Sequence, residues 1–212
     1  MSKVIAIANH KGGVGKTTSA VSIGAGLSKL GEQVLLVDLD PQANLTQSLN
    51  IKHPTANVYS SMNGNKPLQT VNICKRLDAV PSTLELAGVE VNLDNRAGWE
   101  FTLKKLLEPI SGDYDYIIID SPPSLGLLTV NALTSANELL IPIQAQYLAL
   151  QGLTKLLEVV ERIQRELNKG LRIGGVFITQ YDSRKILNRN IAEAVRTHFK
   201  DAIFKTSIRD NI

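Results

Sequence analysis

Nine residues near the amino end combine glycines, lysines and hydroxyls in a pattern that can hold a phosphate group. The segment His10-Lys11-Gly12-Gly13-Val14-Gly15-Lys16-Thr17-Thr18 directly follows an apolar run. Glycines let backbone N–H groups curl around an anion, and a helix that begins there adds partial positive charge. Lys16 can place a full charge near the β- and γ-phosphates of a nucleotide, and Thr17 can ligate Mg²⁺. The predicted nucleotide-binding residues are Lys11, Gly12, Gly13, Val14, Gly15, Lys16, Thr17 and Thr18.

This loop departs from the usual G-x-x-x-x-G-K-[ST] pattern, because His10 stands where the first glycine is expected. It carries a second lysine, Lys11, instead. A chance glycine-rich turn is the alternative, and the strand–loop–helix context argues against it.

Two carboxylates follow the second apolar run, in Asp38-Leu39-Asp40-Pro41-Gln42-Ala43-Asn44. Side chains alternate along an extended segment, so Asp38 and Asp40 point to the same side. At the carboxyl end of a strand, a carboxylate can hold a Mg²⁺-bound water or orient the attacking water. A simple Asp-Pro turn is the alternative. The preceding phosphate loop favours a site.

A third motif, Tyr116-Ile117-Ile118-Ile119-Asp120-Ser121-Pro122-Pro123, places four large apolar residues before a carboxylate. This is the form of a strand whose terminal Asp120 binds Mg²⁺ through water, and the prolines stop the strand. A strand that merely ends in a capping aspartate is the weaker alternative.

Short apolar runs alternate with helical patterns along the chain, which predicts the elements that position these motifs. Strands are expected at 4–8, 34–37, 116–119, 139–141 and 173–179, and helices at 17–29, near 82–93, and at 99–108, 125–136, 151–168 and 186–199. Residues 50–72 are expected to form a loop with a short helix. The pattern predicts one α/β domain over residues 1–212, a doubly wound, mostly parallel sheet with helices on both faces. Ligands of such sheets bind at the carboxyl ends of the strands.

Composition and charge narrow the classes of protein. A single cysteine, Cys74, excludes an internal disulfide and indicates a reducing cytoplasm. No apolar run approaches the ~18 residues of a membrane span. Residues 1–150 carry 11 basic and 13 acidic residues, whereas residues 151–212 carry 12 and 7. The basic carboxyl-terminal part suggests an anionic partner.

Four basic residues fall within about 60° of one face of the predicted 186–199 helix: Lys185, Arg189, Arg196 and Lys200. Apolar side chains expected to pack on the sheet lie on the opposite side: Leu187, Ile191, Ala194 and Val195. Two interpretations of these four basic residues are about equally good. They form either a solvated stripe on an ordinary amphipathic helix or a surface that binds the DNA backbone without sequence preference.

The segment K-G-G-V-G-K-T-T resembles the deviant phosphate loop of the ParA and MinD group of ATPases. D-x-D-P-Q-x-N and D-x-P-P resemble the two switch segments of the ParA branch, and the D-P-Q motif favours that branch over MinD. The resemblance covers nearly the whole chain. It implies catalysis by Lys11, Lys16 and Asp40, with Lys11 reaching across a dimer and Asp40 positioning water. Asp38 would support the loop, and Thr17, Asp40 and Asp120 would hold Mg²⁺.

The same resemblance implies a role in partitioning plasmid or chromosome DNA. The protein would be a cytoplasmic, nucleoid-associated ATPase of weak intrinsic activity, without stable membrane insertion. It would form a homodimer on ATP binding and bind DNA nonspecifically. A ParB-like centromere-binding adaptor would stimulate its ATP hydrolysis. Arg184 matches a DNA-contacting arginine of the family. Ile208-Arg209-Asp210-Asn211-Ile212 resembles the I-P-R-N-V segment that lines the adenine, which puts Asn211 at the nucleotide. Arg209 and Asp210 depart from that pattern.

Two other functions stay open. A MinD-like positioning ATPase needs a terminal amphipathic helix, which residues 205–209 do not form. An unrelated ATP-dependent metabolic enzyme needs a substrate pocket, and the three histidines (His10, His53 and His198) are scattered. The motifs do not separate plasmid from chromosomal origin.

Overall fold

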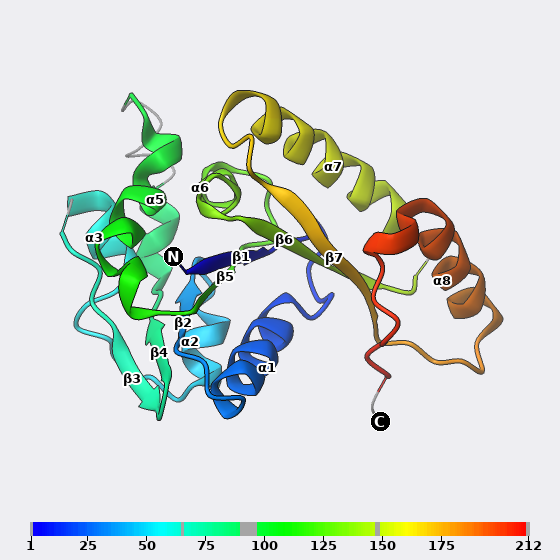
Figure 1. Cartoon of the computed structure of the whole chain (residues 1–212), viewed down its shortest axis with the longest axis horizontal. Helices are drawn as coiled ribbons and strands as arrows, with labels where there is room; N and C mark the ends of the chain where they lie inside the picture. Colours follow the sequence, from blue (N-terminus) through cyan, green and yellow to red (C-terminus); the bar gives the residue numbers. More distant parts are fainter. Residues whose placement is uncertain (1, 65, 90–96, 147–148, 211–212) are drawn as a thin grey trace.

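A single seven-stranded sheet forms the centre of the computed structural model, which describes residues 2–64, 66–89, 97–146 and 149–210 (Figure 1). The strand order is β3-β4-β2-β5-β1-β6-β7, and every neighbouring pair is parallel except β3 and β4. The strands are β1 (Lys3–Ile7), β2 (Val34–Asp38), β3 (Val71–Cys74), β4 (Leu77–Val80), β5 (Tyr116–Asp120), β6 (Glu138–Gln144) and β7 (Arg172–Thr179).

Helices cover both faces of the sheet, as the doubly wound prediction requires. One face packs against α1 (Lys16–Lys29) and α2 (Asn44–Ser48). The other packs against α3 (Val58–Gly64), α5 (Thr102–Leu107), α6 (Leu127–Ser135), α7 (Ala149–Glu166) and, beside β7, α8 (Ile186–Phe199) (Figure 1). Strand residues alternate between the two cores. In β1, for example, Ile5 and Ile7 face α1 while Ala6 faces the other layer.

The register of the central strands brings their carboxyl ends together. Asp120 pairs with Ile7 of β1 on one side and with Asp38 of β2 on the other. Two of the predicted carboxylates therefore lie on adjacent strands, next to the loop that leaves β1.

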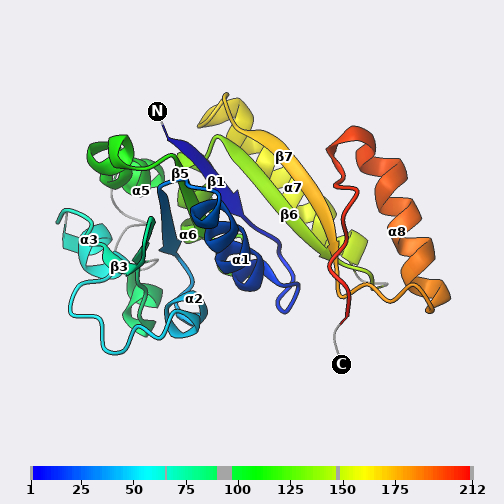
Figure 2. The same cartoon turned by 60° about the horizontal axis from the view of Figure 1, so that its bottom comes forward.

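The carboxyl-terminal segment extends the sheet beyond β7. After the 3₁₀ turn η4 (Lys200–Ala202), the chain runs beside β7 and makes isolated parallel bridges at Ile203 and Arg209 (Figure 2). The Phe204 ring stacks on Phe177 with centroids 6.0 Å apart. A Cβ at position 175 would overlap this ring, so the close approach requires Gly175.

The five expected strands are confirmed, and the differences lie between them. The hairpin of β3 and β4 was not predicted, because each strand is only four residues long and the turn is polar. Arg76 takes φ 65° in that turn. The short α2 was also missed. The 99–108 helix is split into η2 (Trp99–Phe101), α5 and η3 (Glu108–Asp113), since Pro109 cannot continue an α-helix. Near 82–93 the chain forms η1 (Leu84–Leu86) and a helical turn to residue 89, and residues 90–93 lie outside the described ranges.

Candidate nucleotide-binding site

The loop between β1 and α1 has the conformation that its glycines allow. Gly13 and Gly15 take φ 73° and 86°, which disfavour any residue with a Cβ. Helix α1 begins at Lys16, so its free N–H groups point into the loop. The Val14 side chain is buried, with 1% of its surface exposed. Val14 can therefore serve a ligand only through its backbone.

A hollow of about 440 Å³ opens over this loop. Seven of the predicted site residues line it: Gly12, Gly13, Gly15, Lys16, Thr17, Thr18 and Asp40. Five others were not predicted: Gln42, Asn44, Ser48, Pro123 and Gln180. The hollow is where strand ends and the start of a helix meet, which is the expected place for a phosphate group.

Lys16 lies within the curl of the loop. Its side chain is largely buried, and Nζ donates to the Lys11 carbonyl oxygen at 3.4 Å. Burial lowers the pKa of Lys16, while the carboxylates of Asp120 and Asp40 act in the opposite direction. The ammonium group is thus held close to two acidic groups and to the hollow.

Asp120 is fully buried at the end of β5. Neither of its carboxylate oxygens accepts a hydrogen bond of normal geometry within the described ranges. Burial raises the pKa of Asp120 to about 7, and the nearby Thr17 hydroxyl and Lys16 ammonium partly oppose that shift. An unpaired buried carboxylate needs a compensating partner.

The oxygen donors at this site fit Mg²⁺. Asp120, the Thr17 hydroxyl and Asp40 are hard oxygen ligands, and Mg²⁺ is commonly held by one or two carboxylates together with waters and nucleotide phosphates. In the described part of the chain, no group of three or more His, Cys, Asp or Glu side chains is placed to hold a metal ion.

The two carboxylates after β2 have different environments. Asp38 is fully buried and accepts hydrogen bonds from the Thr46 hydroxyl at 2.6 Å and the Thr46 backbone N–H at 2.9 Å. Burial raises the pKa of Asp38 to about 6, although these hydrogen bonds oppose the shift. Asp40 instead lines the hollow and accepts from the Gln42 backbone N–H at 2.9 Å. Asp38 is therefore engaged by hydrogen bonds within the protein, whereas Asp40 lines the hollow.

Lys11 does not line the hollow of its own subunit. Its Nζ donates to Oε1 of Gln144, the last residue of β6, at 3.0 Å and to Oε1 of Gln146, just beyond that strand, at 2.7 Å. Its backbone N–H donates to Asn9 Oδ1 at 3.0 Å, which fixes the start of the loop. The two lysines of the motif thus have separate environments.

Two residues at the end of β7 bind the phosphate loop and were not predicted as site residues. Thr179 Oγ1 donates to the Val14 carbonyl at 2.9 Å, and Gln180 Nε2 donates to the Gly13 carbonyl at 2.9 Å. Gln180 adopts a left-handed φ of 50°. The available signal was the segment Thr179-Gln180-Tyr181-Asp182, polar residues at the carboxyl end of a strand.

Known proteins are similar to this chain in sequence and in fold. The AAA domain family matches residues 2–173. The sporulation initiation inhibitor protein Soj of Bacillus subtilis is 44% identical over 217 residues, an alignment that covers all of this chain and 86% of Soj. The chain belongs to the ParA/Soj family of partition ATPases.

Solved structures agree with this ParA/Soj assignment. A Mycobacterium smegmatis protein described as cobyrinic acid a,c-diamide synthase, with bound ADP and magnesium, is 38% identical with a TM-score of 0.94, covering 100% of this chain and 88% of that one. A plasmid partition protein of Borrelia burgdorferi is 32% identical with a TM-score of 0.88, covering 99% and 90%. The chain is a phosphate-loop ATPase.

None of the helices in the described ranges is long and apolar enough to cross a membrane.

The basic face of this ParA/Soj chain differs in part from the prediction. Arg189 and Arg196 are exposed on α8, while Lys185 and Lys200 flank its two ends. The expectation that Leu187 and Ala194 pack on the sheet was wrong, since both are exposed. At 100° per residue they lie too far round the helix from its buried stripe, which consists of Asn188, Ile191, Ala192 and Val195.

Arg184 is held by a neighbouring carboxylate. Its Nε and Nη2 atoms each lie 3.0 Å from an oxygen of Asp182. The Arg184 guanidinium lowers the pKa of Asp182 to about 2. Lys185 Nζ lies 3.6 Å from Asp210 Oδ2. Asn211, predicted to contact the nucleotide, lies outside the described residues.

Proposed function

We propose that this chain is a partition ATPase that dimerises around ATP, binds DNA without sequence preference and is stimulated by a ParB-like centromere-binding adaptor. Its cargo would be plasmid or chromosome DNA, and its location cytoplasmic and nucleoid-associated. The names of its relatives, Soj and a plasmid partition protein, support partition as the process.

One observation carries the dimer proposal, the position of Lys11 outside the hollow that Lys16 lines. A single buried lysine is already available to the bound phosphates. A second loop lysine that points elsewhere can serve the nucleotide of another subunit. Dimerisation would then depend on the γ-phosphate.

The residues of the hollow support a division of tasks in hydrolysis. Lys16 and the loop N–H groups would bind the β- and γ-phosphates, and Thr17 and Asp120 would hold Mg²⁺, which neutralises phosphate charge when bound. Asp40 would accept a hydrogen bond from the attacking water and orient it. Because Asp38 is engaged by Thr46, it would hold the Asp40 loop in place.

The basic face supports contact with the DNA backbone. Arg184, Lys185, Arg189, Arg196 and Lys200 would contact phosphates, and none of these five side chains is aromatic. A dimer doubles this surface, so ATP would strengthen DNA binding through avidity. Each lost phosphate contact should reduce the salt slope by about 0.9.

DNA binding tests this proposal directly. Fluorescence anisotropy with a random-sequence duplex should show salt-sensitive binding that requires ATP. We expect Arg184→Ala/Arg189→Ala to lose this binding while ATP binding persists. Arg162→Ala/Arg165→Ala, two exposed arginines on α7 beside Glu166, is the matched control. Unchanged DNA affinity in the first variant would place the DNA surface elsewhere.

A metabolic ligase is the second candidate, because the Mycobacterium smegmatis relative is described as a synthase. Among the described residues that line the phosphate-loop hollow, none is a histidine, cysteine or arginine that could bind or activate a second substrate. Stimulation of ATP turnover by DNA together with an adaptor, and not by candidate metabolites, would decide for partition.

A further inference from the structure

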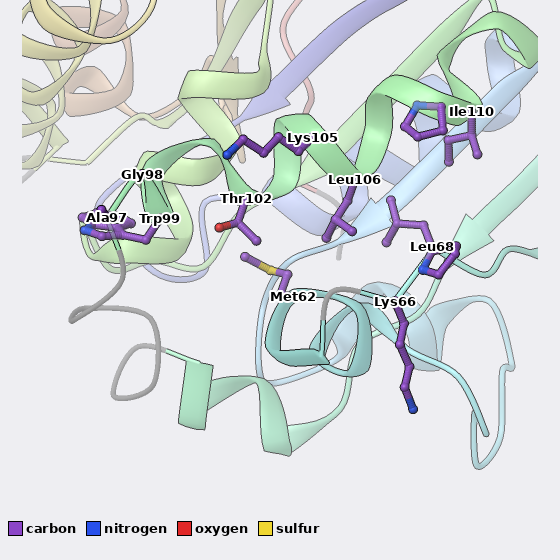
Figure 3. Close-up of a pocket in the computed structure, with 12 residues that line it drawn as sticks. Met62, Lys66, Leu68, Ala97, Gly98, Trp99, Thr102, Lys105, Leu106 and Ile110 are labelled. Atoms are coloured by element: carbon purple, nitrogen blue, oxygen red, sulfur yellow. The ribbon is translucent and has the colours of Figure 1, made fainter.

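A second hollow, of about 490 Å³, lies between α3 and α5 and shares no lining residue with the phosphate-loop hollow (Figure 3). Eight of its twelve lining residues carry apolar side chains. Small-molecule sites typically have volumes of ~300–1,000 Å³ and mostly apolar walls with a few polar groups. This hollow has both properties.

The floor and walls of this hollow belong to the protein core. Met62 and Leu68 are buried, and they form its floor. Trp99, Leu106 and Ile110 are half-buried and pack against the main core, so they form preformed walls. Figure 3 shows Leu68, Leu106 and Ile110 converging, with Met62 pointing toward α5.

The charge at the rim has one sign. Lys66 and Lys105 line opposite sides of the hollow, and both are exposed (Figure 3). Among the described residues that line the hollow, none is acidic. Within the described ranges, neither lysine is within 4.0 Å of a carboxylate. An apolar hollow with a cationic rim is complementary to a molecule with an apolar body and an anionic head.

We propose that this hollow binds a small amphipathic monocarboxylate. The apolar body would lie between Trp99 and Leu106, and its carboxylate would be placed at Lys105, while Lys66 on the opposite side of the rim would add a longer-range attraction. The Thr102 hydroxyl, also at the hollow, can donate a hydrogen bond to the head group. A floor closed by the core suits a compact molecule better than an extended peptide.

The chain offers a direct probe, because Trp99 is its only tryptophan. Titration with decanoate, below its micelle concentration, should change the Trp99 fluorescence saturably. In Lys66→Gln/Lys105→Gln the dissociation constant should rise roughly three- to tenfold. Lys104→Gln is the matched control, since Lys104 is exposed on the same helix but does not line the hollow.

Further variants separate the head group from the hollow. Decanol should bind more weakly than decanoate, and with equal affinity to the wild type and the double lysine variant. Ala97→Phe should fill the hollow and abolish the response while ATP binding persists, which shows that the variant is folded.

Three results would overturn the proposal: no saturable response in the wild type, equal decanoate affinity in the double lysine variant, or a response only to phosphatidylglycerol vesicles. The last would indicate a membrane surface instead of a free ligand. None of these results bears on the proposed partition function.

Discussion

The Lys11 ammonium group donates to the side-chain oxygen of Gln146 at 2.7 Å. Gln144 provides a second acceptor at 3.0 Å, so the lysine expected to serve a partner is held within its own subunit. For Lys11 to reach another subunit, both hydrogen bonds must break. If Lys11 acts across a dimer as proposed, the two glutamines would stabilise the monomer relative to that dimer.

Removing the closer acceptor should favour dimerisation. In Gln146→Ala with ATP, Lys11 has one hydrogen bond fewer to lose, and we expect the dimer dissociation constant to fall roughly three- to tenfold. Sedimentation velocity over a range of protein concentrations measures it. Gln69→Ala, another exposed glutamine, is the control. A dimer that is unchanged or weaker in Gln146→Ala would show that Gln146 does not restrain Lys11.

The tether between β7 and the phosphate loop should support nucleotide affinity. Thr179→Val keeps the side-chain shape but leaves the buried Val14 carbonyl without its donor, at a cost of about 1–3 kcal/mol in the free energy of unfolding. A loosened loop should also lower Mg-ATP affinity severalfold, measured by calorimetry. Thr197→Val, whose hydroxyl bonds within α8, is the control. Destabilisation with normal ATP affinity would restrict Thr179 to a structural role.

The raised pKa of Asp120 predicts how stability depends on pH. Between about pH 4 and 7 the folded protein holds a proton that the unfolded chain releases, so the free energy of unfolding falls as pH rises. From pH 5.5 to 8 this group should account for a loss of about 2 kcal/mol in the nucleotide-free protein. In Asp120→Asn the free energy of unfolding should lack this loss of about 2 kcal/mol between pH 5.5 and 8. The variant should therefore be more stable than the wild type at pH 8.

Urea unfolding in EDTA at both pH values measures this difference. Asp38, whose pKa is also raised, stays in both proteins, so the comparison reports Asp120 together with its electrostatic coupling to Asp38. If the free energy of unfolding changes equally with pH in the wild type and in Asp120→Asn, then Asp120 is ionised in the folded protein at both pH values.

The carboxylate of Asp182 should weaken DNA binding. It engages Arg184 through two atoms and competes with phosphate for that guanidinium. In Asp182→Asn we expect roughly two- to fivefold tighter DNA binding in the presence of ATP, with a steeper salt dependence. Asp201→Asn, at an exposed position in η4, is the control. Weaker binding in Asp182→Asn would show that Asp182 positions Arg184 productively.

The strands that carry the phosphate loop, Asp40 and Asp120 were predictable because each is an unbroken apolar run that ends in a polar motif. Parallel pairing then places those ends side by side, so the core of the site follows from local patterns. The β3–β4 hairpin was not predictable in this way. Its edge strand is half exposed, and it is stabilised by pairing with β4 and by Ile73, which packs against the core.

The contacts made by Thr179, Gln180 and Gln146 could not be inferred from spacing. These residues lie more than 130 positions from the phosphate loop, and only the order of β1, β6 and β7 in the sheet brings them to it. The burial of α8 was misjudged for a similar reason. Leu187 is apolar, but which face of α8 packs depends on where β7 and the carboxyl-terminal segment leave room.

Light scattering with ATP, across three proteins, tests ATP-dependent dimerisation most directly. The wild type should be a monomer with ADP and a dimer with ATP, Lys11→Ala should bind ATP yet stay a monomer, and Asp40→Ala should remain a dimer because it hydrolyses little. If Lys11→Ala forms a dimer with ATP as readily as the wild type does, Lys11 does not act across the subunit interface.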